Sequence, residues 1–569
     1  MPESAVRPYY PQDGVSLVAG PKEPSLWERT VPEILADSAD RYGEREALVF
    51  ADRGLRLTYK AFARSVDELA AGLVALGIEK GDRVGIWSPN KPEWVMTQFA
   101  TARIGAILVT INPAYRLSEL EFALNKVQCK ALVTADRFKS SDYLSMLREL
   151  APELDSCAAG ALESERLPSL RCVIRTGSEE TAGMFTFDAV LARGSAVTVQ
   201  DLDKRSAALS VDEAINIQFT SGTTGTPKGA TLTHRNIANN GRLVVGTQHL
   251  GPGDRLCIPV PLYHCFGMVM GTLGSVTAGA TMVFAGEAFD PLATLDCVAK
   301  EACTALYGVP TMFVAMLEHP EFSAFDLSSL RTGIMAGAPC PIEVMKRVIA
   351  DMNMAGVTIA YGMTETSPVS FQSHTDDPLE RRVSTVGRVH PHVEVKVIGS
   401  DGAILPTGER GELCTRGYSV MKGYWDEPER TAEVLDDDGW MHSGDQAVID
   451  AEGYCEIVGR VKDMLIRGGE NVYPREVEDF LYRHPKVQQV QVFGVSDAKF
   501  GEEVCAWIVL KPEQKSSEEE IRSFCQGQIA HYKIPRYVRF KDELPMTVTG
   551  KPQKFKMRDA MEEELAKAD

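Results

Sequence analysis

The sequence predicts an α/β protein with a large, multi-lobed N-terminal domain and a smaller, mobile α+β C-terminal domain. Its 569 residues exceed what one hydrophobic core usually organises. From about residue 32 to residue 199, short apolar runs alternate with amphipathic helical patterns, as in a wound and largely parallel sheet. Near residue 393, and again after Arg460, this alternation gives way to other patterns. We therefore expect two wound α/β subdomains, a small β-barrel-like subdomain and a separate C-terminal domain.

The first lobe carries the clearest α/β alternation. One amphipathic helix ends near Gly77 and has its apolar face on four residues: Phe62, Val66, Leu69 and Leu73. Buried strands are predicted to follow at 83–87, 106–109, 131–134 and 170–174. Such strands, separated by helices, favour a parallel sheet that is covered on both faces.

Residues 256–286 contain no Asp, Glu, Lys or Arg and are numerous enough to span a bilayer. Pro259, Pro261 and several glycines would interrupt a continuous helix there. The pattern instead predicts a buried strand, a helix and a second buried strand. No transmembrane segment is therefore expected.

The later lobes have shorter elements. Between Val393 and Gly423, strand-like runs are broken by Asp-Gly, Thr-Gly and Arg-Gly pairs, which predicts a small antiparallel, barrel-like subdomain. Beyond Arg460 the pattern predicts a helix at 474–482, strands at 487–495 and 504–510, a helix at 518–529 and then a tail. The predicted domains are residues 1–461 and 462–569.

Charge and cysteine content exclude several functions. The formal net charge of -19 argues against nonspecific nucleic-acid binding, which needs basic patches. The 12 cysteines include no C-x-x-C pair, so neither a zinc motif nor a disulfide framework is predicted. The first 13 residues lack the pattern of a signal peptide, and the chain does not end in a peroxisomal tripeptide. A cytoplasmic enzyme is expected.

Residues 220–230, Thr-Ser-Gly-Thr-Thr-Gly-Thr-Pro-Lys-Gly-Ala, form the most informative motif. We expect this loop to join a strand at 215–219 to a helix at 234–248, with backbone N–H groups converging on an anion. It is not a Walker A motif, because Lys228 lies between Pro227 and Gly229. A surface turn rich in Gly and Thr is the alternative. The predicted polyphosphate ligands are Thr220, Ser221, Gly222, Thr223, Thr224, Gly225 and Lys228.

This loop resembles the signature loop of the adenylate-forming acyl-CoA synthetases, which activate carboxylic acids with ATP. The family also contains amino-acid adenylation domains and beetle luciferases, so the loop implies acyl-adenylate formation and leaves the second half-reaction open. The similarity covers about residues 30–560. Together with residues 112–116 and 385–388, it points to the medium-chain fatty-acyl-CoA ligases of the family.

A second motif, residues 361–365, resembles the adenine and metal motif of the family. By this resemblance Tyr361 stacks on adenine, Thr364 bonds the α-phosphate and Glu365 holds Mg²⁺, a hard cation that prefers oxygen ligands. Taken alone, these five residues fit a buried aromatic and a solvated carboxylate equally well. The other adenine-binding positions implied by the resemblance are Gly337, Ala338, Pro339, Gly362 and Met363.

The resemblance also assigns residues near the domain boundary. Asp445 and Arg460 would bind the ribose hydroxyls, and the hinge would lie at Lys462. Gly468 and Gly469 would line a pantetheine tunnel that admits CoA. As bare patterns, Gly-Asp and Gly-Arg are common in loops, so these roles rest on the family.

Lys551 is the predicted catalytic residue, in a stretch that resembles the C-terminal lysine loop of the family. A cation placed between a carboxylate and a phosphate stabilises the charge that develops in the transition state. Most lysines that follow Thr-Gly are simply solvated, so the position within the family carries the assignment. Thr364, Glu365 and Lys228 complete the predicted catalytic set.

His264 has two interpretations. A lone histidine in an apolar run is most often a core side chain. The family places an aromatic gate there, which would alternately block the tunnel and admit CoA.

The sequence thus predicts an AMP-forming acyl-CoA ligase that uses ATP, Mg²⁺ and CoA. Residues 262–267 carry no acidic group for a substrate ammonium, which disfavours amino-acid activation. Apolar stretches at 307–313 and 330–335 favour an apolar acid, with short thio, branched and aryl acids open. A carrier-protein-loading enzyme and a non-catalytic nucleotide-binding regulator are the alternatives. Oligomeric state is not fixed, and a homodimer is kept open.

Overall fold

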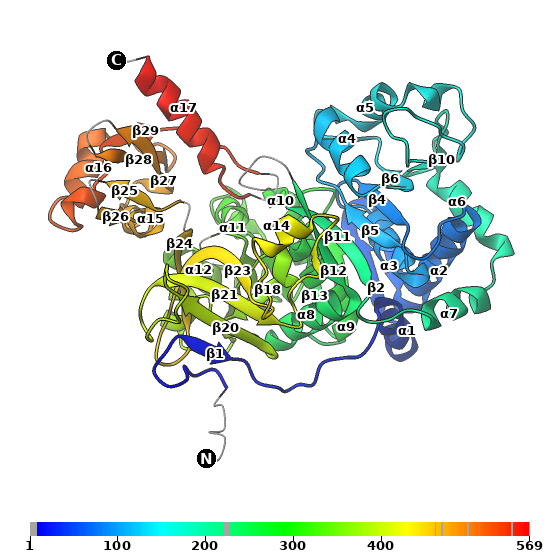
Figure 1. Ribbon diagram of the computed structural model, residues 1–569, viewed down its shortest axis with the longest axis horizontal. Helices are drawn as coiled ribbons and strands as arrows, with labels where there is room; N and C mark the ends of the chain where they lie inside the picture. The colour runs from blue at the N-terminus through cyan, green and yellow to red at the C-terminus, as the bar shows by residue number, and fades with distance from the viewer. Residues whose placement is uncertain are drawn as a thin grey trace.

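The computed structural model describes residues 8–220, 227–338, 340–460, 463–467, 470–497, 500–547 and 550–567. Figure 1 shows two large sheets with helices between and around them, an antiparallel sheet beside the second, and a small unit formed by the C-terminal part of the chain. This arrangement confirms the predicted mixed α/β fold with a large N-terminal and a small C-terminal part.

The first sheet has eight strands in the order β10-β9-β6-β4-β5-β11-β12-β22, parallel from β10 to β11 and antiparallel beyond. Successive residues of β6 face different cores: Ala131 and Val133 pack on one side and Leu132 on the other. Both faces are therefore covered, as the apolar runs predicted. The strands are β4 (Arg83–Trp87), β5 (Ile107–Thr110), β6 (Ala131–Thr134), β9 (Cys172–Arg175), β10 (Phe185–Thr186), β11 (Ala214–Thr220), β12 (Lys228–Thr233) and β22 (Gly423–Tyr424).

The second sheet has nine strands in the order β19-β18-β17-β16-β15-β13-β14-β2-β3, parallel from β17 to β2. Its strands are β2 (Glu46–Phe50), β3 (Leu55–Thr58), β13 (Arg255–Cys257), β14 (Thr281–Phe284), β15 (Ala305–Gly308), β16 (Thr332–Ala336), β17 (Gly356–Gly362), β18 (Val369–Gln372) and β19 (Arg388–Val389). Val283 faces the outer core and its neighbours Met282 and Phe284 face the core between the sheets.

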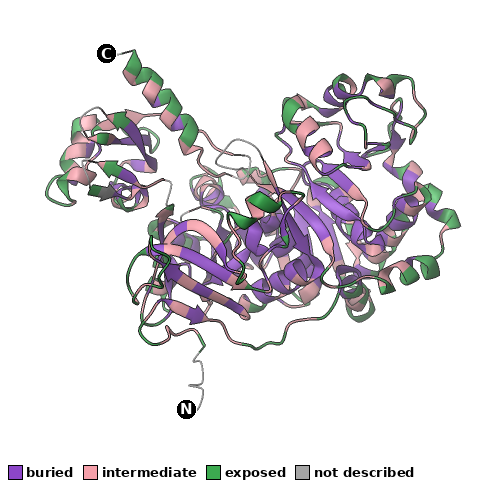
Figure 2. Cartoon of the chain, viewed as in Figure 1, coloured by how far each residue is buried: buried purple, intermediate pink, exposed green. Residues whose placement is uncertain are grey.

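Helices fill the layers around these sheets. Between the two sheets lie α1 (Val31–Tyr42), α2 (Tyr59–Ala75), α3 (Pro92–Ile104) and α8 (His234–Thr247), whose buried residues share one core. The outer face of the first sheet carries α4 (Leu117–Lys126) and α5 (Tyr143–Leu150). The outer face of the second carries α10 (Pro291–Lys300), α11 (Pro310–Leu317) and α12 (Ile342–Asp351). Figure 2 shows the resulting buried interior.

The charge-free segment forms the elements that its pattern predicted. Strand β13 leads through a π-helix at Phe266–Leu273 and α9 at Gly274–Ala278 to β14, and the π-helix is buried throughout. In the described part of the chain, no helix is both long and apolar enough to cross a membrane.

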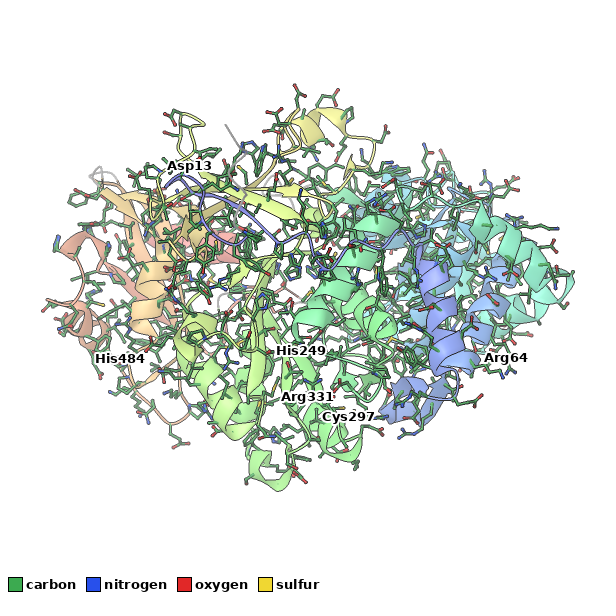
Figure 3. The ribbon with its side chains drawn as sticks, turned by 90° about the horizontal axis from the view of Figure 1, so that it is seen from below. Asp13, Arg64, His249, Cys297, Arg331 and His484 are labelled. Carbon is green, nitrogen blue, oxygen red and sulfur yellow. The ribbon has the colours of Figure 1, made fainter. Side chains whose placement is uncertain are left out.

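The two ends of the second sheet differ in function. At the amino-terminal ends of its parallel strands, Arg331 pairs with Asp254 at 2.7 Å and donates to the carbonyl of His249 at 2.8 Å, and Figure 3 labels Arg331 and His249 there. At the carboxyl ends, β16 and β17 lead into residues 337–338 and 363–365 of the predicted site. Ligands in open α/β sheets bind outside these carboxyl ends.

The third sheet is antiparallel, as predicted for its region, and has the order β1-β20-β21-β23-β24. Its first strand, β1 (Leu17–Ala19), comes from the N-terminal segment and pairs with β20, which sequence reasoning did not anticipate. A three-residue strand has too short a pattern to be recognised. The other strands are β20 (Val393–Ile398), β21 (Gly411–Gly417), β23 (Met441–Ile449) and β24 (Cys455–Arg460).

The C-terminal unit has its own sheet, in the order β26-β25-β28-β27 with β29 paired to β28, and its own core. The predicted tail is wrong, because β29 (Tyr537–Phe540) runs parallel to β28 and α17 (Lys554–Ala566) packs on β27. The other elements are β25 (Leu465–Arg467), β26 (Glu470–Val472), α15 (Pro474–Leu481), β27 (Val487–Asp497), β28 (Gly501–Leu510) and α16 (Glu518–Cys525).

The predicted strand-to-helix connection at the phosphate loop is also wrong. The residues after Thr220 lead into another strand, β12, which pairs antiparallel with β11 so that Thr220 lies opposite Lys228. Helix α8 begins only at His234, after the end of β12, so the motif is followed by a strand rather than by a helix. Strand β12 is short and rich in Gly and Thr, and its pairing with β11 and β22 rather than its own pattern makes it a strand.

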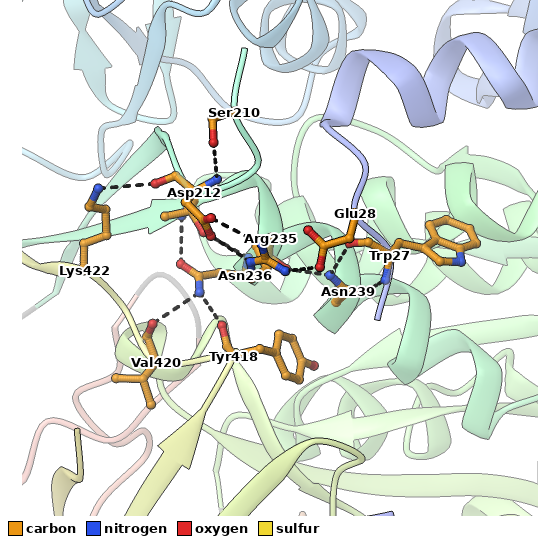
Figure 4. Close-up of polar contacts among 11 residues, drawn as sticks. Trp27, Glu28, Ser210, Asp212, Arg235, Asn236, Asn239, Tyr418, Val420 and Lys422 are labelled. Atoms are coloured by element: carbon orange, nitrogen blue, oxygen red, sulfur yellow. Dashed lines mark hydrogen bonds and ion pairs between the residues drawn. The ribbon is translucent and has the colours of Figure 1, made fainter. Parts of the chain in front are cut away.

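The first turns of α8 join three distant segments, as Figure 4 shows. Arg235 pairs with Glu28 and with Asp212, the latter at 2.7 Å. Asn236 donates to the carbonyls of Tyr418 and Val420, the latter at 3.2 Å. These contacts fix the segment that leads into β22, beside the predicted phosphate loop.

Candidate active site

A buried carboxylate, Glu365, forms the centre of the site. Its Oε1 accepts hydrogen bonds from the Tyr424 hydroxyl at 2.9 Å and from the Thr220 hydroxyl at 3.3 Å. Only 6% of the residue is exposed. The predicted metal ligand is thus held beside the first residue of the predicted phosphate loop, although the two are 145 residues apart in the sequence.

Local backbone geometry places Glu365. A Cβ on Gly362 would lie 1.7 Å from the carbonyl oxygen of Pro368, so only glycine allows the close approach of these two segments. The Met363 amide then donates to the same Pro368 carbonyl at 3.0 Å. The Glu365 carbonyl accepts from the Met421 amide at 2.9 Å, which ties the motif to the segment before β22.

Tyr424 is a site residue that sequence reasoning missed. Pairing of β22 with β12 sets Tyr424 opposite Ala230, and the Lys228 ammonium lies 4.8 Å from the centre of the Tyr424 ring. Burial and the neighbouring Glu365 raise the pKa of Tyr424. The hydroxyl therefore stays protonated and donates a hydrogen bond to the carboxylate. A Gly-Tyr-Trp run at 423–425 was the available signal, but nothing local linked it to Glu365.

The predicted ribose-binding residues adjoin the predicted adenine-binding tyrosine. Asp445 Oδ2 accepts from the Tyr361 hydroxyl at 2.6 Å, and Asp445 Oδ1 lies 3.1 Å from Arg460 Nε. Residues 445 and 460 lie opposite each other on β23 and β24. Burial, together with Asp445, raises the pKa of Tyr361 well above its usual value. A carboxylate and a guanidinium so arranged can bind a pair of adjacent hydroxyls.

Lys551 comes from the C-terminal unit into the same site. The Thr547 amide donates to the Lys551 carbonyl at 2.7 Å, and Gly550, just before Lys551, has a φ of +77°. The Lys551 Cε lies 4.0 Å from where a Cβ of Gly337 would be, at the end of β16. The predicted catalytic lysine therefore meets the predicted adenine wall.

The surroundings of Lys551 lower its pKa below the ordinary value. Burial is the main cause and the charge of Arg460 adds to it, while Glu365 and Asp445 act in the opposite direction. Glu365, Asp445 and Arg460 are thus close enough to change the pKa of this ammonium. Lys551 is the cation that could stabilise charge between two anionic substrates.

His264 precedes the π-helix and is near enough to Lys551 for the two charges to interact. Burial and the charge of Lys551 lower its pKa to about 3, so the imidazole is neutral at pH 7. The next residue, Cys265, donates from its thiol to Oε1 of Gln218, a buried residue of β11, at 3.1 Å. A neutral ring at this point fits either earlier interpretation, and the gate stays a prediction.

Several predicted residues lie outside the described part of the chain, so their placement is not tested: Ser221, Gly222, Thr223, Thr224, Gly225, Pro339, Lys462, Gly468 and Gly469. The described ones come from all three sheets of the large domain and from the C-terminal unit, and the contacts above link Thr220 with Glu365, Tyr361 with Asp445, and Lys551 with Gly337. Thr364 is 7% exposed and follows β17, and Gly337 and Ala338 follow β16.

The donor set suits the predicted divalent cation. Among the described residues, both hydrogen bonds to the Glu365 carboxylate go to Oε1, which leaves Oε2 available as a hard oxygen ligand. The neighbouring Thr220 and Thr364 hydroxyls are of the same chemical kind. Mg²⁺ fits this arrangement, because it keeps several waters and needs few protein ligands.

Comparison with known proteins decides the family. The family model for AMP-binding enzymes matches residues 35–425, and the model for the AMP-binding enzyme C-terminal domain matches residues 476–551. The chain belongs to the AMP-binding enzymes. The domain boundary predicted between residues 461 and 462 lies between the two matched segments and stays a prediction.

Relatives of this AMP-binding enzyme match it over nearly their full length. YngI of Bacillus subtilis (strain 168), named as a candidate acyl-CoA synthetase, is 50% identical over 94% of this chain and 97% of its own. The mitochondrial medium-chain acyl-CoA ligase ACSF2 of Danio rerio is 47% identical over 98% of this chain and 92% of its own. The solved anthranilate CoA ligase AuaEII, in complex with anthranoyl-AMP, has a TM-score of 0.83 at 26% identity and covers 95% of this chain and 98% of its own.

Proposed function

We propose that this chain is an AMP-forming acyl-CoA ligase that converts a carboxylic acid, ATP and CoA into acyl-CoA, AMP and pyrophosphate. One observation carries the proposal. Lys551 of the C-terminal unit reaches the site that Glu365, Asp445 and Arg460 form on the large domain. An acid-activating enzyme needs such a site, with a cation where two anionic substrates meet.

In the first step, a carboxylate oxygen of the acid attacks the α-phosphorus of ATP, and the bond from this phosphorus to the bridging oxygen of pyrophosphate breaks. Asp445 and Arg460 hold the ribose, and Lys228 and the Thr220 hydroxyl face the polyphosphate. Lys551 stabilises the negative charge that gathers around the α-phosphate. Mg²⁺, when bound at Glu365, would neutralise part of the polyphosphate charge.

In the second step, the CoA thiol gives its proton to solvent, its sulfur attacks the acyl carbon, and AMP leaves with the electrons of the broken acyl-oxygen bond. The product is a thioester. Lys551 occupies the site during the first step, so the C-terminal unit must move before the thiol can enter. The predicted hinge at Lys462 and the predicted tunnel at Gly468 and Gly469 belong to this step.

The proposed substrate is a fatty acid of medium chain length. Residues of the predicted acyl-binding stretches, Tyr307, Val309 and Met312, share one apolar core with Phe266 and Met268 of the π-helix. Walls of this kind favour an apolar tail. The medium-chain ligases named among the relatives support the same choice. One methylene contributes only about 1 kcal/mol, so a range of chain lengths is expected to react.

The decisive experiment measures pyrophosphate and AMP release from the purified protein with ATP and Mg²⁺. A panel of straight-chain acids is compared with branched, sulfur-containing and aryl acids, each with and without CoA. CoA-dependent turnover that peaks with straight-chain acids of medium length supports the proposal. Pyrophosphate release that CoA does not accelerate would instead favour loading of a carrier protein. Absence of pyrophosphate and AMP release with every acid would show that the protein is not a ligase for these acids.

The metal is tested separately. Replacing Mg²⁺ with a chelator is expected to abolish pyrophosphate release, and Glu365→Gln is expected to raise the Mg²⁺ concentration needed for half-maximal activity. A cytoplasmic location and a homodimer are further proposals from the sequence, which fractionation of cells and light scattering would test.

A further inference from the structure

Three side chains on the antiparallel sheet converge outside the machinery assigned above. Glu412 and Cys414 lie two residues apart on β21, and His442 lies directly opposite Cys414 on β23. A register irregularity between Glu412 and Cys414 brings the three to one place. One ligand-type atom from each lies within 4.8 Å of those of the other two. An oxygen, a sulfur and a nitrogen donor thus meet over one small volume.

Two of the separations match the edges of a tetrahedral metal site. His442 Nδ1 lies 3.6 Å from Cys414 Sγ and 3.3 Å from Glu412 Oε2. For Zn²⁺, bond lengths of about 2.3 Å to sulfur and about 2.0 Å to nitrogen or oxygen imply edges of roughly 3.3–3.6 Å. The third edge joins Glu412 Oε2 to Cys414 Sγ. The Glu412 side chain is 29% exposed, so it can turn to bring these two atoms to the distance that the metal requires.

Hydrogen bonding can satisfy only one of the two contacts to His442 Nδ1 well. Both neighbours approach the same ring nitrogen, and Nδ1 carries either one proton or one lone pair in the ring plane. A lone pair can accept from the thiol but faces the carboxylate oxygen unfavourably. A proton can serve only one of the two well. A cation between the three atoms satisfies all of them at once.

The outer neighbours of this group are a hydrogen-bond donor to Glu412 and a carboxylate near His442 that lies beyond hydrogen-bonding distance. Glu412 Oε1, the oxygen that does not face His442, accepts from the Gly444 amide at 3.1 Å. On the far side of the imidazole, Asp436 Oδ2 lies 3.9 Å from Nε2. Metal-binding carboxylates are themselves hydrogen-bonded, and metal-binding histidines direct their second nitrogen to a carboxylate.

We propose that Glu412, Cys414 and His442 bind one Zn²⁺ ion per chain, with solvent as the fourth ligand. The donor set of thiolate, imidazole and carboxylate is one that Zn²⁺ prefers and Mg²⁺ does not. The predicted Mg²⁺ site at Glu365 is therefore chemically distinct. The proposal does not depend on ligase activity, because it concerns binding alone.

Binding is expected to release a proton. Burial and the charges of Glu412 and Asp436 raise the pKa of the Cys414 thiol, against the opposing effect of Lys396, to about 12. At pH 7 the thiol is protonated, and Zn²⁺ must displace this proton. Affinity therefore rises with pH by at most about tenfold per unit as long as one proton is lost.

The test is a titration of chelator-treated full-length protein with Zn²⁺ by calorimetry, and with Co²⁺ by absorption spectroscopy. We expect one site, a sulfur-to-cobalt charge-transfer band and a higher Tm with Zn²⁺, since an ion that binds only the native state stabilises it. Cys414→Ser and His442→Gln should each lower the affinity at least about tenfold and remove the rise in Tm.

Matched controls are Cys157→Ser and His249→Gln, which remove a more exposed thiol and an exposed imidazole elsewhere and should change nothing. Each variant is compared with the parent in chelator, where an equal Tm shows that folding is intact. If Cys414→Ser fails to fold, the half-buried His442 variant decides. Zn²⁺ binding that survives both substitutions, a cobalt spectrum without the sulfur band, or no binding at all would overturn the proposal.

Discussion

The two halves of the active site are built differently. On the large domain, Glu365 accepts hydrogen bonds from Thr220 on β11, from Tyr424 on β22 and from Met421 in the segment before β22. Lys551 instead belongs to the C-terminal unit, which has its own core. The half that carries Glu365 is fixed by strand pairing, whereas the predicted catalytic lysine reaches it from a unit with a separate core.

The docking surface supports this contrast. A Cβ on Gly550 would lie 2.9 Å from both Thr311 Oγ1 and Val309 Cγ2, so only glycine allows this close approach to the large domain. The Arg410 guanidinium lies 3.9 Å from the ring centre of Tyr473 on the C-terminal unit. A cavity of about 50 Å³ remains between α11 and α15. Contacts of this kind between units with separate cores are compatible with the domain movement proposed above.

The largest expected effect comes from removing the delivered cation. Lys551→Ala should lower acyl-adenylate formation by about 10²–10³-fold, as loss of one charge-stabilising group does, while ATP binding persists. Acid-dependent exchange of labelled pyrophosphate into ATP measures this step. Lys556→Ala, an exposed lysine five residues away, is the control. Equal exchange in the Lys551 variant and the parent would remove Lys551 from the mechanism.

The same residue gives the exchange reaction an alkaline limit. Because the pKa of Lys551 is lowered from 10.5, the charged form is lost as pH rises through a value below 10.5. The exchange rate should fall as pH rises through this value. In Lys551→Arg the fall should begin at a higher pH. His264, with its pKa of about 3, should contribute nothing between pH 5 and 8.

The anchoring of the lysine loop is expected to have the next largest effect. Lys554 Nζ lies 2.7 Å from Glu478, whose side chain is 5% exposed and also accepts the Val492 amide. Lys554→Met leaves this carboxylate without its cation and should destabilise the C-terminal unit by about 3 kcal/mol.

Hydrogen exchange of β27 and α15 amides measures this local stability. Amides of the large domain should be unaffected, since their core is separate. Lys533→Met, which breaks the more exposed pair with Glu476, is the control and should cost less than about 1 kcal/mol. Equal losses of local stability in the two variants would show that the buried Lys554–Glu478 pair contributes no more than the exposed pair.

On the fixed half of the site, Tyr424→Phe removes one hydrogen bond to Glu365. The expected loss is about 1–1.5 kcal/mol, or roughly tenfold, in the activity supported by Mg²⁺. Initial rates over a range of Mg²⁺ concentrations measure it. Tyr454→Phe removes a similar bond to Asp377 at 2.7 Å, remote from Glu365, and should leave the Mg²⁺ dependence unchanged.

The smallest effect is expected at the docking surface. Arg410→Gln or Tyr473→Leu should slow adenylation by about 2–5-fold, because a partly exposed cation-π contact contributes roughly 0.5–1 kcal/mol. Tyr473→Phe keeps the ring and should be nearly neutral. The second step, measured with supplied acyl-adenylate and CoA, should not slow. The double variant should be no worse than either single one if the two residues act as a pair.

The sequence by itself determined the chemistry available and most of the elements. Apolar runs with a period of two or of 3.6 predicted β4, β6 and α8, because local periodicity reports which face is buried. The motifs around Glu365, Asp445 and Lys551 were recognised as separate pieces. The charge and functional groups of these residues do not depend on where the fold places them, so the sequence alone reveals them.

Only the tertiary structure decided which pieces meet. Strand β12 exists because β11 and β22 lie beside it, and Tyr424 belongs to the site because that pairing sets it against Glu365. Glu412 and His442 are 30 residues apart, so their convergence with Cys414 had no local spacing to reveal it. Contacts between distant segments depend on strand register and core packing, and a local pattern encodes neither.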